Sequence, residues 1–203
     1  MSETAEATGR REATKERNRE AILSAGLEVF SEIGYGQATV RDLIRASGLA
    51  TGTFYNYFPD KESVLRALVD RSAVELRAKL AQSRAGAATA EEFVRGGFRV
   101  FFAYLATDPT FFSLLSRNAG AVRQLLDEPI LGSAIGELSE DLKAAVERGE
   151  MPAFDPTLMS AAMAGAALEM GVAVLERGVA TPDEAAEFAS RLFLRGFEGL
   201  SAG

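Results

Sequence analysis

The chain has 203 residues, which is enough for one or two compact domains, each with a buried core. Its hydrophobic content of 47% and charged content of 25% are ordinary for a globular protein, and its formal net charge is −7. Because the sequence has no cysteine and no histidine, disulfides, thiolate nucleophiles, the usual zinc sites and every histidine-based triad are excluded.

The negative charge is concentrated in the second part of the chain. Residues 1–71 carry 10 Lys and Arg against 11 Asp and Glu, whereas the remainder carries 12 against 18. The front of the chain can therefore approach an anionic partner in spite of the overall charge. Residues 1–13 are expected to form a flexible arm that leads into a basic stretch made of Arg10, Arg11, Lys15, Arg17 and Arg19.

The first residues are polar and acidic, unlike the apolar core of a signal peptide. We expect no apolar run long enough to span a bilayer, which takes about 20 residues. The sequence therefore predicts a cytoplasmic protein.

The first predicted helix covers about residues 14–33, where apolar residues recur at helical spacing until Gly34 ends the helix. Thr39 and Asp42 have the spacing of a capping box and begin a second helix, which Gly48 ends after about two turns. A third short helix is predicted over residues 50–57.

After Pro59 a longer helix is predicted, with Leu65, Leu68, Val69, Leu76 and Leu80 on its buried side. Further helices are expected to begin at the cap patterns of Thr89, Asp108, Asp155 and Thr181. The fold class is therefore all-α. The expected organisation is a flexible arm over residues 1–13, a three-helix domain over 14–60, a connecting helix over 61–83 and a second helical domain over 84–203.

Two short helices joined by a turn that contains Gly48 have the dimensions of a DNA-binding helix-turn-helix. The second of them carries small residues, hydroxyls, an amide and phenols, which suit close approach to bases and phosphates. Phe54 and Phe58 have the spacing of core residues.

Residues 14–68, and above all the segment 48–62 (GLATGTFYNYFPDKE), closely resemble the TetR family of transcriptional regulators. The resemblance implies that Thr51, Gly52, Thr53 and Asn56 face bases or nearby backbone. It also implies phosphate contacts from Thr39, Arg41, Tyr55, Tyr57 and Lys61. Ala50 departs from the family pattern, in which a hydroxyl residue often caps this helix.

The TetR resemblance implies a cavity in the C-terminal domain, and the aromatic and methionine side chains concentrated there favour a small, mostly apolar effector. The alternative is that these side chains only fill a helical core. The candidate lining residues are Phe101, Phe102, Leu105, Phe111, Leu115, Met163 and Met170. A polar head group has candidate anchors in Arg99, Arg117, Asn118 and Arg123.

The last two predicted helices combine small and large apolar residues, and the run 159–174 is almost wholly apolar. A helix that is apolar on all sides needs a partner on each side, which favours a homodimer. The predicted interface residues are Ala162, Ala166, Ala173, Phe193, Phe197 and Leu200.

The sequence therefore favours a ligand-responsive transcriptional regulator, in particular a repressor, that binds a palindromic operator as a homodimer and needs no metal or other cofactor. One alternative is a helical protein-interaction module that does not bind DNA. Another is a small helical enzyme that uses paired carboxylates such as Glu137, Glu140 and Asp141, although no nucleophile–base pair accompanies them.

Overall fold

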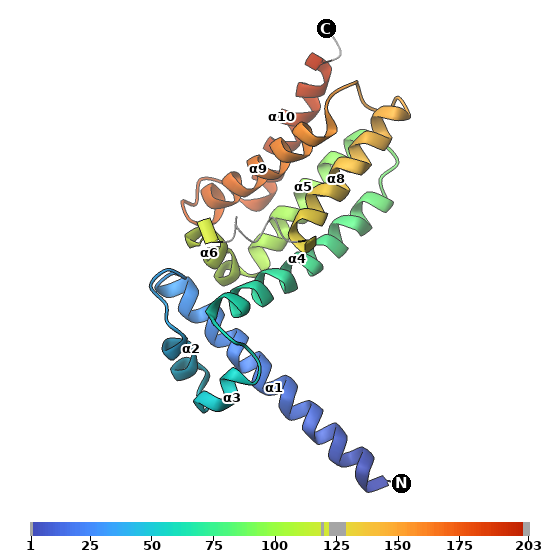
Figure 1. Cartoon of the computed structure of the whole chain (residues 1–203). Coiled ribbons are helices and arrows are strands. Elements are labelled where there is room, and N and C mark those ends of the chain that lie inside the picture. Colours follow the sequence, from blue (N-terminus) through green and yellow to red (C-terminus); the bar gives the residue numbers. More distant parts are fainter. Residues whose placement is uncertain (1, 119, 122–128, 201–203) are drawn as a thin grey trace. The chain divides into compact units, whose positions relative to one another are not determined.

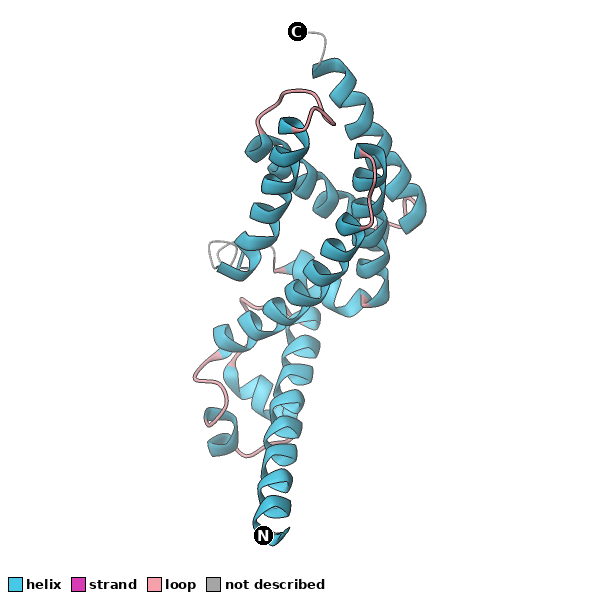
Figure 2. Ribbon diagram, turned by 90° about the vertical axis from the view of Figure 1, so that its right-hand side faces the viewer, coloured by secondary structure: helices cyan, strands magenta, loops and turns pink. Residues whose placement is uncertain are grey.

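The computed structural model describes residues 2–118, 120–121 and 129–200, and every regular element in these ranges is a helix (Figures 1 and 2). The prediction of an all-α fold is confirmed. The chain consists of two compact units. Unit 1 comprises residues 1–71 and 113–122, and unit 2 comprises residues 72–112 and 123–203.

Unit 1 contains the helices α1 (Ser2–Glu32), α2 (Val40–Ser47) and α3 (Thr51–Tyr55), the first part of α4 (Lys61–Ala85) and the last part of α6 (Pro109–Arg117). Its core consists of fully buried side chains from α1, α2, α3 and α4, namely Ile22, Leu23, Phe30, Leu43, Phe54, Val64, Leu65 and Leu68.

Gly26 permits the close packing of α1 on α4. A Cβ added at this position would lie 2.6 Å from Val64 Cγ1. The apolar spacing of the sequence thus produces the predicted three-helix domain.

One helix is longer than expected. Residues 2–13, predicted to be a flexible arm, are the first turns of α1. The prediction from composition was wrong here because Glu, Lys, Arg and Ala all have high helix propensity and the helix already begun at residue 14 can extend through them.

Unit 2 is a helical bundle made of the rest of α4, α5 (Ala90–Thr107), the start of α6, α8 (Pro129–Glu147), α9 (Pro156–Leu175) and α10 (Pro182–Leu200) (Figure 1). The helix starts predicted from cap patterns are confirmed. Thr89 accepts from the Glu92 amide, Asp155 from the amides at 157 and 158, and Thr181 from the Glu184 amide.

The core of unit 2 is rich in aromatic side chains. Phe98 stacks on Phe193 with ring centroids 5.5 Å apart, and Phe154 stacks on Phe197 at 5.3 Å. Gly171 of α9 lets Leu105 and Phe112 approach, since a Cβ there would lie 2.8 Å from Leu105 Cδ1.

Helix α9 corrects the expectation that no segment is long and apolar enough to cross a membrane. By length and composition α9 meets that test, and only 28% of its apolar window is buried inside the chain. Most of the apolar window of α9 is therefore not buried within the single chain.

Candidate nucleic-acid interface

The turn between α2 and α3 aligns the two helices. Gly48 adopts a left-handed conformation at φ +67° and ends α2, and its amide donates to the Arg45 carbonyl. Ala50 is extended, and α3 begins at Thr51, so the predicted helix over 50–57 is shorter than expected. Phe54 and Phe58 anchor the segment in the core at 0% and 5% exposure, as their spacing predicted.

Burial of the two phenylalanines leaves the polar side of α3 exposed. Thr51, Gly52, Tyr55 and Asn56 are exposed and Thr53 is half-buried. Ala50 forms no side-chain cap, and nothing lies within 4 Å of a Cβ added at Gly52. The start of α3 therefore presents backbone amides with no side chain to keep a phosphate or base away.

The start of α2 carries a complete capping box. Thr39 accepts from the Asp42 amide, and Asp42 accepts from both the amide and the hydroxyl of Thr39. The hydrogen bonds from Thr39 hold the pKa of Asp42 below its ordinary value. Arg41 is exposed and has no ion-pair partner among the described residues, so its guanidinium is available to a phosphate.

The recognition segment, residues 51–58, contains two tyrosines with different surroundings. Tyr55 is 53% exposed, and its ring meets the edge of Phe54. Tyr57 is half-buried, and its hydroxyl accepts from the Asn18 amide nitrogen at 3.4 Å. Asn18 thereby connects α1 to the end of the recognition segment.

Lys61, predicted to contact phosphate, has an internal role in this structure. Its Nζ donates to the carbonyls of Tyr35 at 2.7 Å and Ala38 at 2.9 Å, and it lies 4.4 Å from the centroid of the Tyr35 ring. These bonds fix the turn that precedes Thr39. An ammonium has three donors, so one N–H is left for a phosphate.

Asn118 holds the other side of the same turn and was not predicted to belong to this domain. Its Oδ1 accepts from the Tyr35 amide at 2.6 Å, and its Nδ2 donates to the carbonyls of Phe30 at 3.2 Å and Leu114 at 2.7 Å. The side chain is 6% exposed. Arg117 beside it donates to the Glu32 carbonyl, so the end of α6 caps the last turn of α1. Neither residue is an open anchor for a ligand head group.

The residues predicted to line an effector pocket are mostly packed in the described core. Phe102, Leu105, Phe111 and Met163 are 2–7% exposed, whereas the remaining three, Phe101, Leu115 and Met170, are half-buried. Phe101 meets Phe102 edge to face.

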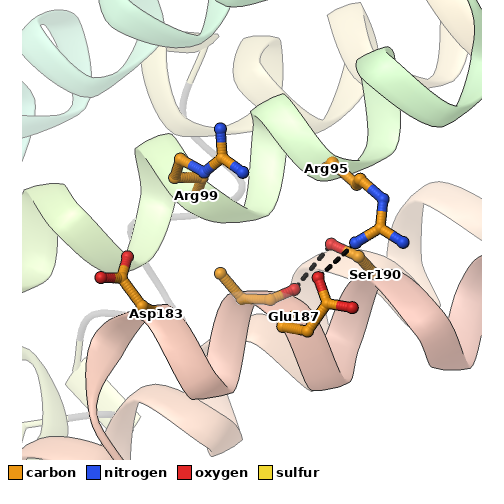
Figure 3. Close-up of a pocket in the computed structure, with 6 residues that line it drawn as sticks. Arg95, Arg99, Asp183, Glu187 and Ser190 are labelled. Atoms are coloured by element: carbon orange, nitrogen blue, oxygen red, sulfur yellow. Dashed lines mark hydrogen bonds and ion pairs between the residues drawn. The ribbon is translucent and has the colours of Figure 1, made fainter.

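Two hollows of unit 2 lie elsewhere. One, of about 260 Å³ between α5 and α10, is lined by Arg95, Arg99, Glu187, Asp183, Ala186 and Ser190, and Arg95 pairs with Glu187 across it (Figure 3). A larger cleft of about 840 Å³ lies along α4, α5 and α8. Arg123, the fourth predicted head-group anchor, is outside the described residues.

Two of the three carboxylates considered for an enzyme form ion pairs. Glu137 binds Arg77 and Arg84, and Asp141 binds Arg84 at 2.6 Å. The bond from Arg77 is the main reason that the pKa of Glu137 lies below its ordinary value. The ion pairs of Glu137 and Asp141 connect α8 to α4, which is a structural role.

The predicted dimer residues do not form one exposed surface. Phe197 is 5% exposed and lies in the core, Phe193, Ala166 and Ala173 are half-buried, and Ala162 is exposed. The side chain of Leu200 lies outside what the structure describes.

The apolar side chains that do reach the surface of α9 and α10 were missed. Leu158 and Leu168 of α9 are 70% and 43% exposed, and Phe188 and Leu192 of α10 are 63% and 52% exposed. Phe188 and Leu192 are four residues apart and share one face of α10, whereas Leu158 and Leu168 are ten residues apart and lie about 80° apart around α9. The sequence pattern did not reveal these faces, because α9 is apolar on every side.

The family model for bacterial regulatory proteins of the tetR family matches residues 22–68, which contain α2, α3 and the parts of α1 and α4 that pack on them. Many solved structures have similar folds, for example those of three regulators. The first is a protein of Syntrophomonas wolfei assigned to the TetR-family transcriptional regulators, at 24% identity and a TM-score of 0.78, covering 94% of this chain and 97% of that one.

The second is the fatty acid degradation regulator FadR of Bacillus halodurans, at 24% identity and a TM-score of 0.75, covering 87% of this chain and 94% of that one. The third is PfmR of Thermus thermophilus, at 23% identity and a TM-score of 0.68, covering 86% and 97%.

The helix-turn-helix with its exposed polar side lies within the residues that match this family model, so the chain carries the DNA-binding domain of bacterial regulatory proteins. Residues 22–68 thus match the tetR family of bacterial regulatory proteins, as the resemblance of segment 48–62 predicted, and the solved structures share the fold of the chain.

Proposed function

We propose that this regulator binds an inverted-repeat operator as a homodimer, represses transcription from it, and releases it when a small apolar effector binds. The observation that carries the DNA-binding part is the exposed polar side of α3 above the buried pair Phe54 and Phe58. On this proposal Thr51, Gly52, Thr53 and Asn56 face base edges in the major groove.

The phosphates on either side of the groove are held by Thr39, Arg41, Tyr55, Tyr57 and Lys61. Asn56 supplies the most informative test, because an amide is the side chain that pairs with two atoms of adenine. Asn56→Ala is expected to lower discrimination at one base pair by about 1–3 kcal/mol, measured by binding to single-base variants of a duplex selected from random sequences. Equal discrimination by both proteins would remove Asn56 from the base-reading set.

The dimer proposal rests on the exposed apolar faces of α9 and α10. In a four-helix interface, Leu158, Leu168, Phe188 and Leu192 would meet the same residues of a second copy, and Ala162 would let the helices approach closely. This arrangement gives the apolar surface of α9 a protein partner, which agrees with a soluble cytoplasmic regulator and accounts for the helix without a membrane.

The test of the interface has a matched control in the chain. Phe188→Glu and Leu192→Glu each place a charge on the proposed interface, and Val179→Glu places the same charge at a position of similar exposure, 66% against 63% for Phe188, outside both helices. Light scattering coupled to size exclusion should show monomers for the two interface variants and dimers for Val179→Glu. Dimers from all three variants would contradict the proposed interface.

Aromatic, leucine and methionine side chains line the proposed effector pocket, namely Phe101, Phe102, Leu105, Phe111, Leu115, Met163 and Met170. A pocket forms among packed side chains only if some of them move, and methionine is suited to that. Two of the similar structures are a fatty acid degradation regulator and a fatty acid metabolism regulator, so a long-chain fatty acid is the first probe to use.

Binding at about 100 times the dissociation constant would raise the free energy of unfolding by about 2.7 kcal/mol. The fatty acid should therefore raise the Tm of the protein and release DNA, and Met163→Trp should abolish both effects.

A protein that binds no selected duplex at low salt would instead favour the alternative of a protein-interaction module.

A further inference from the structure

The N-terminal part of α1 extends beyond the packed body of unit 1. Residues 9–17 are all exposed, and partial burial begins only at Asn18. Figure 1 shows this part of α1, in blue, running past α3 with no other helix of unit 1 along it. Two or more exposed helical turns with no packing role are available for a partner.

On these turns of α1 the basic and the acidic side chains lie in separate rows along the helix. Residues four and seven positions apart share one face of a helix. Arg11 and Lys15 therefore form a row with Asn18, and Arg10 forms the adjacent row with Thr14 and Arg17. The bond from Arg17 Nη2 to Thr14 Oγ1, at 3.4 Å, agrees with that second row. The carboxylates of Glu12, Glu16 and Glu20 form a separate row.

The contacts of the packed part show which way each row faces. Asn18, in the row of Arg11 and Lys15, donates to the Tyr57 hydroxyl at the end of the recognition segment. Glu20, in the acidic row, pairs at 2.9 Å with Arg71 of α4. The row of Arg11 and Lys15 thus lies on the side of α1 that faces Tyr57, the acidic row lies on the α4 side, and the row of Arg10 lies between these two sides.

Three basic residues at the start of α1 are available to bind an anionic partner. Within the described part of the chain, Arg10, Arg11 and Lys15 have no carboxylate partner. Arg11 precedes Asn18 by two helical turns, which is about 10 Å along the helix axis. Arg11 and Lys15 therefore lie on the N-terminal side of the contact between Asn18 and Tyr57, on the same face of α1.

We propose that the N-terminal turns of α1 are a second DNA-contacting element, in which Arg10, Arg11 and Lys15 bind backbone phosphates that flank the base pairs read by α3. The partner is double-stranded DNA because the row of Arg11 and Lys15 continues the face of α1 that contacts Tyr57, and Arg10 lies in the adjacent row, on the unit that holds the helix-turn-helix. These contacts are to phosphates, so they add affinity and salt dependence without sequence preference. The inference rests on DNA binding by α3.

The test compares two variants of equal net charge in the full-length protein. The first is Arg10→Gln, Arg11→Gln and Lys15→Gln together. The control is Lys79→Gln, Lys143→Gln and Arg177→Gln together, three exposed cations of unit 2 with no ion-pair partner among the described residues. Binding to a duplex selected by the unaltered protein is measured by fluorescence anisotropy at several salt concentrations.

Each lost phosphate contact lowers the salt slope by about 0.9, so three contacts lower it by about 2.7. Between 50 and 200 mM salt the unaltered protein should then lose about 40-fold more affinity than the α1 variant. The control variant should keep the original slope. On a duplex trimmed to the selected core sequence, the difference between the α1 variant and the unaltered protein should disappear.

Equal slopes for the two triple variants on the long duplex would overturn the proposal. The proposal would also be overturned if the α1 variant lost as much affinity on the trimmed duplex as on the long one, because that result would show a defect in the recognition segment. If the α1 variant binds DNA normally but loses binding to vesicles of phosphatidylserine and phosphatidylcholine, the basic rows serve a membrane instead. Failure of the unaltered protein and the control to bind any duplex would count against DNA binding itself.

Discussion

Asn118→Ala tests whether the side chain of Asn118 stabilises the turn that follows α1. The change leaves the Tyr35 amide and the Phe30 carbonyl without their side-chain partner, while Leu114 still accepts from the backbone amide of residue 118. A buried polar group without a partner costs about 1–3 kcal/mol, so two groups cost about 2–6 kcal/mol if no water replaces the amide.

Tyr35 is only half-buried, so water can reach its amide and the expected loss lies near 2 kcal/mol. For a chain of 203 residues this corresponds to a fall in Tm of about 4–8 °C. Arg117→Ala is the control, because it removes an exposed bond from the neighbouring residue to the Glu32 carbonyl and should cost less than about 0.5 kcal/mol.

Thermal unfolding followed by circular dichroism gives the stability difference, and hydrogen exchange gives the local effect. The Tyr35 amide should exchange faster in Asn118→Ala, whereas the Leu43 amide, bonded to the Thr39 carbonyl within the α2 start, should not. An unchanged Tyr35 exchange rate, or a Tm equal to that of Arg117→Ala, would refute this account of the turn.

Other substitutions test separate contacts. Lys61→Met should lower the free energy of unfolding by about 1–2 kcal/mol, seen as a lower urea midpoint, because it removes both hydrogen bonds to the carbonyls of the turn. An unaltered midpoint would leave phosphate binding as the only role of Lys61. Glu137→Gln should be less stable than the unaltered protein above pH 4.5, and the difference should vanish as the pH falls through the lowered pKa of Glu137; a pH-independent difference would contradict the ion pairs as its cause. Gly171→Ala should lower the Tm by overpacking Leu105, at a cost of about 1–3 kcal/mol, whereas Gly97→Ala, which meets nothing within 4 Å, should not lower it.

The elements that could be predicted from the sequence are those fixed by neighbouring residues. The capping box of Thr39 and Asp42, the left-handed Gly48 and the caps at Thr89 and Asp155 depend on atoms within a few residues of each other. The exposed polar side of α3 follows from the spacing of Phe54 and Phe58, which are buried as predicted.

The features that were missed depend on residues far apart in the chain. Asn118 reaches Phe30 and Tyr35 across 88 and 83 positions, and no local pattern marks it as part of the DNA-binding unit. Lys61 could not be assigned to the Tyr35 carbonyl for the same reason, since a lysine near a recognition helix matches a phosphate contact equally well.

The dimer residues show a different limit. In α9 nearly every position is apolar, so periodicity does not tell an inward face from an outward one, and Leu158 and Leu168 were overlooked. Phe197 was assigned to the interface because it lies on the last helix, but it stacks on Phe154 in the core.

The central claim is that α3 reads DNA from a symmetric dimer, and one measurement addresses it directly. Duplexes selected from random sequences by the full-length protein would be sequenced and then footprinted. We expect an inverted repeat whose half-sites are protected about 34–36 Å, or one helical turn, apart, as two recognition helices on one face of DNA require. Enrichment of no sequence, or protection of a single unrepeated site, would contradict the claim.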